Sequence, residues 1–175
     1  YKSFEMDSIA FIKKVKTNSF LDTGLGYDES HCYLITAVDI EGDESGYSDI
    51  VCGTTNGPPE FQITNYKLID PSNNNYLDSR EEGALRFAIL NEGSSPSKNI
   101  IITVSPFDND NKNNFVFIDS TKIIENLNID EAKYFELKIN ADLKVKSGDW
   151  KYVLNVIDEN GFILKEPYEF IINTK

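Results

Sequence analysis

The sequence has little of what most catalytic and binding sites need. In 175 residues there are one histidine, two cysteines, one methionine and one tryptophan, and 17 basic side chains stand against 29 acidic ones. A net charge of −12 repels phosphate backbones, so we expect no nucleic-acid partner. No apolar run approaches the roughly 20 residues of a membrane-spanning helix, and no membrane span is expected.

Nucleophilic catalysis and zinc binding are also not expected. His31 and Cys32 are neighbours on a predicted strand, where adjacent side chains point to opposite faces and form no dyad. One histidine and two cysteines fall short of the three or four convergent ligands of a zinc site. The sequence therefore predicts a protein that is not an enzyme and that carries no cofactor.

Two loops are rich in side-chain oxygen, the ligand that calcium prefers. The first, DPSNNNYLDSREE, offers Asp70, Asp78 and Glu82, and the second, DNDNKNN, offers Asp108 and Asp110. Neither loop has the glycine at the sixth position or the distal glutamate of an EF-hand loop. Ordinary Asn-rich turns are the preferred interpretation, so no metal is expected and these five residues are weak calcium candidates.

The apolar pattern has a period of two almost throughout, as in strands with one buried face. Clusters of Asn, Asp, Gly, Ser and Pro separate the alternating runs and suit turns. The only helix candidate, residues 120–135, contains a pair of isoleucines that favours a strand and a turn instead. The class predicted is all-β, with tandem β-sandwiches. The expected inward residues are Leu85, Phe87, Ile89, Ile100, Ile102, Val104, Phe135, Leu137, Ile139, Tyr152, Leu154, Val156, Tyr168, Phe170 and Ile172.

A domain boundary is expected at Pro58-Pro59, where a strand-like run ends and a new pattern begins. The predicted domains are residues 1–57 and 58–175. The amino end has neither an initiating methionine nor a signal peptide, so we expect a piece of a longer polypeptide.

Residues 19–55 resemble the carboxy-terminal half of a fibronectin type III domain. The resemblance rests on the S-F-x-D-T-G-L turn, the Y-x-I-T-A-V-D strand, the G-x-E-S turn and the S-x-x-V-C-x-T-T strand. It implies that the first two strands and most of the third are missing, which leaves apolar faces wet and backbone donors unpaired. The family usually has a tyrosine where His31 stands, so its corner hydrogen bond is in doubt, and the imidazole is expected to substitute as donor.

Cys32 and Cys52 lie on the two strands that flank the loop of residues 39–47. If this loop closes an antiparallel hairpin in which Val38 faces Gly46 and Ile35 faces Asp49, then Cys32 faces Cys52 at disulfide distance. The resemblance to secreted bacterial members of the family also implies this bond. A disulfide places the chain outside the cytoplasm, extracellular or on the cell surface, and a pair of reduced thiols is the alternative.

Residues 59–175 resemble, less specifically, immunoglobulin-like modules that occur in tandem in secreted bacterial proteins. The resemblance rests on E-E-G-A-L-R-F-A-I-L-N-E-G-S-S-P-S-K-N-I-I-I-T-V, on S-G-D-W-K-Y-V-L-N-V-I-D-E-N-G-F and on the closing strand E-F-I-I-N-T-K. The aromatic residues of this part fit a core better than a sugar-stacking platform. Trp150, at the start of a strand, is the possible exposed exception.

The function predicted is a non-catalytic pair of modules in a larger secreted or cell-surface bacterial protein, serving as spacer, scaffold or adhesive surface. One alternative is the accessory region of a secreted peptidase or glycosidase whose catalytic domain lies elsewhere. Another is a filament subunit that is completed by strand donation. The expected partners are the remainder of the polypeptide or neighbouring subunits, with a possible strand donor for residues 1–57.

Overall fold

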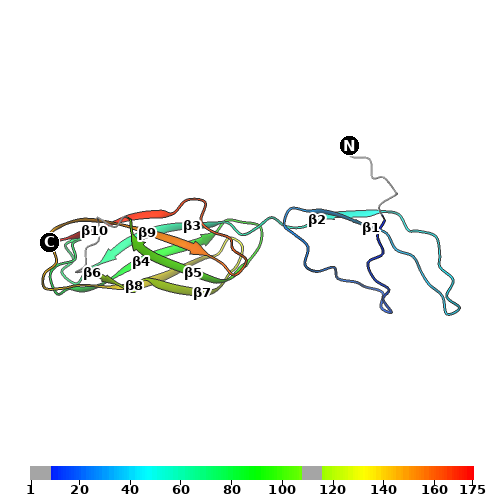
Figure 1. The fold of residues 1–175 in the computed structure, drawn as a ribbon, viewed down its shortest axis with the longest axis horizontal. Coiled ribbons are helices and arrows are strands. Elements are labelled where there is room, and N and C mark those ends of the chain that lie inside the picture. The colour runs from blue at the N-terminus through cyan, green and yellow to red at the C-terminus, as the bar shows by residue number, and fades with distance from the viewer. Residues whose placement is uncertain (1–8, 108–115) are drawn as a thin grey trace.

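The computed structural model describes residues 9–107 and 116–175, and this part of the chain consists of strands and loops without a helix. The all-β class is therefore confirmed. The amino-terminal part of the chain contributes two short strands and the rest contributes eight longer or edge strands (Figure 1). The strands are β1 (Ser30–Tyr33), β2 (Val51–Thr54), β3 (Phe61–Ile69), β4 (Glu82–Asn91), β5 (Ser97–Pro106), β6 (Val116–Ile118), β7 (Thr121–Leu127), β8 (Ala132–Ala141), β9 (Gly148–Ile157) and β10 (Tyr168–Thr174).

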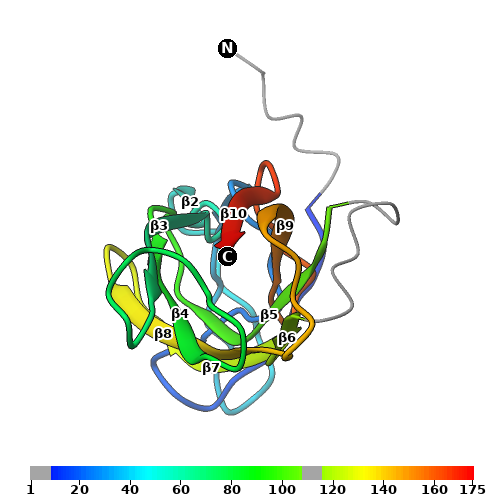
Figure 2. The ribbon, with the colours of Figure 1, turned by 90° about the vertical axis from the view of Figure 1, so that its left-hand side faces the viewer.

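Two four-stranded sheets form a sandwich from β3 onward. Their strand orders are β10-β9-β5-β7 and β3-β4-β8-β6, and neighbouring strands are antiparallel. Figure 2, viewed along the long axis, shows the two sheets facing each other. Residues 120–135 give β7, a turn and the start of β8, so the preference for a strand over a helix is confirmed.

The core lies between these two sheets and follows the period-two prediction. Phe87 is fully buried at its centre, and its ring lies 5.4 Å from that of Phe135 and 5.2 Å from that of Phe170. Of the fifteen residues expected to face inward, Tyr168 alone is only partly buried, and it packs against the core. Two further aromatic residues expected in the core, Phe115 and Phe117, are not part of this comparison, because Phe115 and the side chain of Phe117 lie outside what the structure describes.

Pro58 and Pro59 immediately precede the sandwich, and the segment that contains them is hydrogen-bonded to the loop after β4. The backbone N–H of Ser94 donates to the Pro58 carbonyl (3.0 Å), and the buried Asn91 side chain accepts from the N–H of Glu60 (3.2 Å). A Cβ on Gly93 would approach the Pro58 oxygen to 2.4 Å, so only glycine fits where the two segments cross. The entry to the sandwich is thus tied to its first hairpin.

The amino-terminal hairpin pairs Cys32 with Cys52, but its predicted register fails beyond Tyr33. Val38 bridges Glu44 rather than Gly46, and the carbonyl of Ile35 accepts from the N–H of Ser48 rather than from Asp49. Serine hydroxyls cause the slip, because those of Ser45 and Ser48 take the N–H groups of Ala37 and Ile35 in place of carbonyls. Only four residue pairs remain in a regular ladder.

Candidate interaction surface

The calcium candidate Asp70 accepts hydrogen bonds from residues of its own loop. Its Oδ2 accepts from the N–H groups of Asn74 (2.7 Å) and Asn75 (3.1 Å) and from the Ser72 hydroxyl (3.2 Å). Burial raises the pKa of the Asp70 carboxyl, but these hydrogen bonds outweigh burial and hold the pKa below its ordinary value. The carboxylate serves to close the loop between β3 and β4.

The other calcium candidates do not join Asp70 in a common site. Asp78 accepts a hydrogen bond from the Asn74 amide (3.1 Å), and Glu82 is exposed at the first residue of β4. Among the described residues, Asp70, Asp78 and Glu82 do not bring their oxygens within reach of one ion. Asp108 and Asp110 lie outside the described residues.

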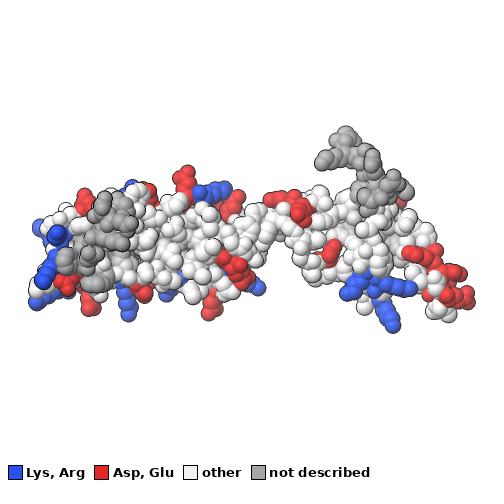
Figure 3. Space-filling model, in the orientation of Figure 1, with Lys and Arg blue, Asp and Glu red and all other residues white. Residues whose placement is uncertain are grey.

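A group of three acidic residues lies at the tip of the amino-terminal hairpin. Asp39, Glu41 and Asp43 are exposed, and their carboxylates lie within 4.8 Å of one another. Figure 3 shows acidic side chains gathered at this tip, whereas both signs of charge are mixed over the sandwich. The Asp39 Oδ1 accepts the N–H groups of Glu41, Gly42 and Asp43, each at 2.9 Å. The only sign of this group in the sequence is the D-x-E-x-D spacing of its three acids. In the structure, the hydrogen bonds to Asp39 close a turn.

Trp150, which the sequence offers as a possible exposed aromatic, is partly exposed. Its ring is half-buried and packs against the sandwich core. Its Nε1 donates to the Thr174 Oγ1 (2.9 Å), at the end of the neighbouring strand β10. The indole therefore fastens the last strand of the sandwich to β9.

The single histidine does not make the expected corner bond to backbone. The Nε2 of His31 lies 3.2 Å from the Oε2 of Glu29, two residues before it, and both side chains are partly exposed. The Tyr33 hydroxyl instead spans the corner, donating to the Asp22 carboxylate (2.9 Å). That hydrogen bond to an anion raises the pKa of Tyr33.

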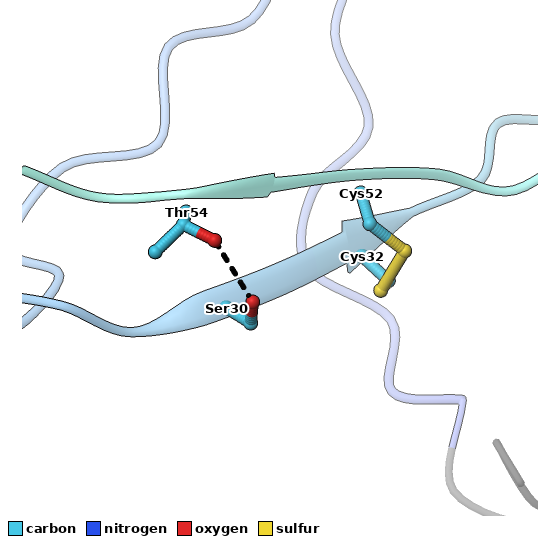
Figure 4. The surroundings of a disulfide bond; sticks show 4 residues. All are labelled: Ser30, Cys32, Cys52 and Thr54. Atoms are coloured by element: carbon cyan, nitrogen blue, oxygen red, sulfur yellow. Dashed lines mark hydrogen bonds between the residues drawn. A yellow bond between two sulfur atoms is a disulfide. The ribbon is translucent and has the colours of Figure 1, made fainter. Parts of the chain in front are cut away.

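A disulfide lies on one face of the β1–β2 sheet and links the two strands. Cys32 and Cys52 are joined, and the hydroxyls of Ser30 and Thr54 lie 3.0 Å apart on the same face (Figure 4). A covalent bond and a polar contact thus hold these two strands together where a sandwich would use a core.

The opposite face, which carries Tyr33 and Val51, is open. Val51 is 69% exposed, and Ile35, beyond the end of β1, is 73% exposed. None of residues 9–57 is buried, although this segment holds many large apolar side chains. Among the described residues, β1 and β2 pair only with each other. This open two-stranded sheet is the strongest candidate for an interaction surface in the described chain.

No protein family profile and no curated protein matches the chain. Solved structures with similar strand arrangements include a FixG-related protein from Vibrio parahaemolyticus, with 16% identity, a TM-score of 0.41 and coverage of 66% of this chain and 96% of that one. A conjugative transposon lipoprotein from Bacteroides eggerthii has 14% identity, a TM-score of 0.42 and coverage of 67% and 98%. A family 123 glycoside hydrolase from Clostridium perfringens has 15% identity, a TM-score of 0.38 and coverage of 57% and 22%.

Proposed function

We propose that this chain is a non-catalytic spacer in a larger extracytoplasmic bacterial protein, built from a fibronectin type III-like segment and an immunoglobulin-like sandwich. The observation that carries the proposal is the path of the chain through the sandwich. It enters at the end where β3 starts and leaves at the opposite end, where β10 finishes (Figure 1). A module with that path sets a fixed distance between whatever precedes it and whatever follows it.

The hydrogen bonds at the start of the sandwich support this role, because a spacer keeps a fixed distance only if the linker between its parts is rigid. Residues 58–60 are bonded to the loop after β4, and the ring of Tyr27, before the linker, contacts the ring of Phe162 (5.2 Å between centroids). The edge-to-face contact and the proline pair limit rotation between the two parts.

The disulfide supports an oxidising location, since such bonds persist outside the cytoplasm. The acidic composition supports a role without nucleic acid. None of the described residues forms a helix long and apolar enough to cross a membrane.

Distance measurement between two spin labels tests the proposal. Gln62 near the start of β3 and Lys175 after β10 are both exposed, so each accepts a label without loss of packing. A spacer gives one narrow distance distribution that stays the same in high salt and in millimolar calcium. A distribution with two populations, or one that shifts when a solute is added, would show a module that closes on a ligand and would contradict the proposal.

A further inference from the structure

The chain contains two Asn-Gly pairs, Asn56-Gly57 and Asn160-Gly161. In such a pair the backbone nitrogen of glycine can attack the side-chain amide carbon of asparagine, because glycine has no Cβ to hinder the approach. Both asparagines are exposed, so water reaches both pairs. The two pairs differ in how their backbone is held.

The Asn160-Gly161 pair lies in a tight turn that fixes its backbone. The Gly161 N–H donates to the Asp158 carbonyl (3.1 Å), and the Asp158 N–H donates to the Phe162 carbonyl (3.0 Å). The buried Asp158 carboxylate also accepts the N–H groups of Asn160 and Phe162, each at 2.9 Å. The glycine nitrogen is therefore engaged in a hydrogen bond, and freeing it requires the turn to open.

The Asn56-Gly57 pair, in contrast, is held by a single hydrogen bond. The Asn56 carbonyl accepts from the N–H of the exposed Asp28 (3.1 Å). In the described part of the chain, the Gly57 N–H has no acceptor. Rotation of this peptide group therefore costs only one exposed hydrogen bond, and the glycine nitrogen reaches the asparagine side chain without further unfolding.

We propose that Asn56 is a site of spontaneous deamidation, where the linker before the sandwich changes chemically as the protein ages. The Gly57 nitrogen bonds to the Cγ of Asn56, the Cγ–Nδ2 bond breaks, and ammonia leaves with the proton that the glycine nitrogen gives up. The product is a succinimide ring. Water then opens this ring, which gives aspartate if water attacks Cγ and isoaspartate if it attacks the backbone carbonyl carbon.

Either product alters the linker. The Asp28 carboxylate lies beside Gly57, with its Oδ1 3.0 Å from the position of a Cβ on that glycine, so it repels a new negative charge on residue 56. Isoaspartate also adds one carbon atom to the main chain. Both changes weaken the hydrogen bond between Asp28 and residue 56, next to the contact of Tyr27 with Phe162. Deamidation thus loosens the connection between the two parts of the chain.

Timed incubation of the 175-residue chain in mildly alkaline buffer, followed by peptide mapping with mass spectrometry, tests the proposal. Asn56 should deamidate at least about 10-fold faster than Asn160, because several hydrogen bonds must break before the Gly161 nitrogen can attack. Equal rates at the two positions, or faster reaction at Asn160, would overturn the proposal.

The same measurement in guanidinium chloride separates the effect of structure from that of local sequence. In the unfolded chain neither pair is held, so the two rates should become similar. A difference as large as that in the folded protein would show that neighbouring residues set the rates, and it would contradict the structural argument.

The matched variant is Asn56→Gln, which keeps a side-chain amide at this exposed position but closes the ring far less readily. It should remove the reaction at residue 56 and leave the rate at Asn160 unchanged. Unchanged total release of ammonia would place the main reaction at another residue and would contradict the assignment to Asn56.

Amide exchange of Asp28 tests the effect on the linker. This amide should exchange about 2- to 10-fold faster in aged than in fresh protein, the effect of one hydrogen bond, and should not change in aged Asn56→Gln. Equal exchange in fresh and aged wild type would show that the linker is not loosened. The spacer proposal is tested separately, because its spin labels at Gln62 and Lys175 both lie after the linker.

Discussion

The two parts of this chain use the same strand pattern with opposite results. From Phe61 to Ile172, alternating apolar residues face one another across two sheets and are buried. In residues 9–57, apolar residues such as Ile35 and Val51 alternate in the same way but face solvent. Period-two alternation thus gives strands with an apolar face, and only a second sheet turns that face into a core.

Stability in the two parts also comes from different sources. The sandwich draws on burial around Phe87, whose ring contacts aromatic rings from both sheets. The hairpin has one disulfide, a short ladder and hydrogen bonds from serine and threonine hydroxyls. We therefore expect core substitutions and the loss of the Asp70 carboxylate to lower the stability of the sandwich, and reductants to lower that of the hairpin.

A matched pair of isoleucine substitutions should show the largest contrast. Ile102 is fully buried on β5, and Ile102→Ala should lower the free energy of unfolding of the sandwich by about 2–5 kcal/mol, from lost burial and a residual cavity. Ile35→Ala, at a residue that is 73% exposed, should change it by less than about 0.5 kcal/mol. Denaturant unfolding followed by tryptophan fluorescence measures both, and equal effects would remove the distinction between the parts.

Reduction of the disulfide should affect the hairpin alone. On the chain-entropy model, closing a loop with a sequence separation of 20 stabilises by about 3 kcal/mol, and little else holds β1 to β2. With a reductant, amide exchange in residues 30–54 should accelerate to near the unfolded rate, and the melting temperature of the sandwich should stay within about 2 °C. A large drop in that melting temperature would show that the hairpin supports the sandwich.

Two loop aspartates with similar hydrogen bonds provide a finer test. Asp70 is buried and Asp39 is exposed, and each accepts several backbone N–H groups in its own loop. Asp70→Ala should lower the free energy of unfolding by about 2 kcal/mol, because the loop loses three hydrogen bonds to this buried carboxylate. Asp39→Ala should leave the unfolding of the sandwich unchanged. The reverse order of effects in thermal melts would contradict the account.

The effect of Asp70→Ala should also depend on pH. The pKa of Asp70 is lowered in the folded protein, so its stabilisation is complete above the unfolded pKa of about 3.9 and disappears as pH falls through the folded value. The difference in stability between the wild type and Asp70→Ala should therefore shrink below about pH 4. A constant difference from pH 7 to pH 2 would show that the charge of the carboxylate plays no part.

The smallest predicted effect lies at high pH and concerns the sandwich core. Burial raises the pKa of Tyr152 to about 12. Its protonated form therefore stabilises the fold fully below the unfolded pKa of about 10, and this contribution is lost as pH rises towards about 12. Tyr152→Phe should shift alkaline unfolding, followed by circular dichroism, to higher pH. An unchanged midpoint would show that another group governs it.

Much of the sandwich could be predicted because local pattern and burial agree there. The alternation of Phe135, Leu137 and Ile139 places each on the inner face, and the structure buries all three. The link between Asn91 and Glu60, just after the two prolines, was not predictable, because a polar residue at a strand end gives no sign of the segment that it will bind. The division at Pro58-Pro59 stays a prediction.

The hairpin shows where sequence reasoning lost accuracy. The register of Cys32 and Cys52 followed from counting across the loop, and it is observed. The same count failed at Val38, because serine hydroxyls compete with backbone carbonyls and residue counting does not register side-chain acceptors. The hydrogen bond of the partly exposed Trp150 was equally outside the reach of residue counting, since its Nε1 donates to a hydroxyl 24 residues away on another strand.

The most direct test of the central claim, that residues 9–57 have no core of their own, is calorimetry of residues 58–175 beside the 175-residue chain. The account predicts the same melting temperature within about 2 °C and nearly the same unfolding enthalpy for the two proteins. A folded unit of 57 residues would add about 40 kcal/mol of unfolding enthalpy near 60 °C. An excess of that size in the longer chain, or a clearly lower melting temperature in the shorter one, would contradict the account.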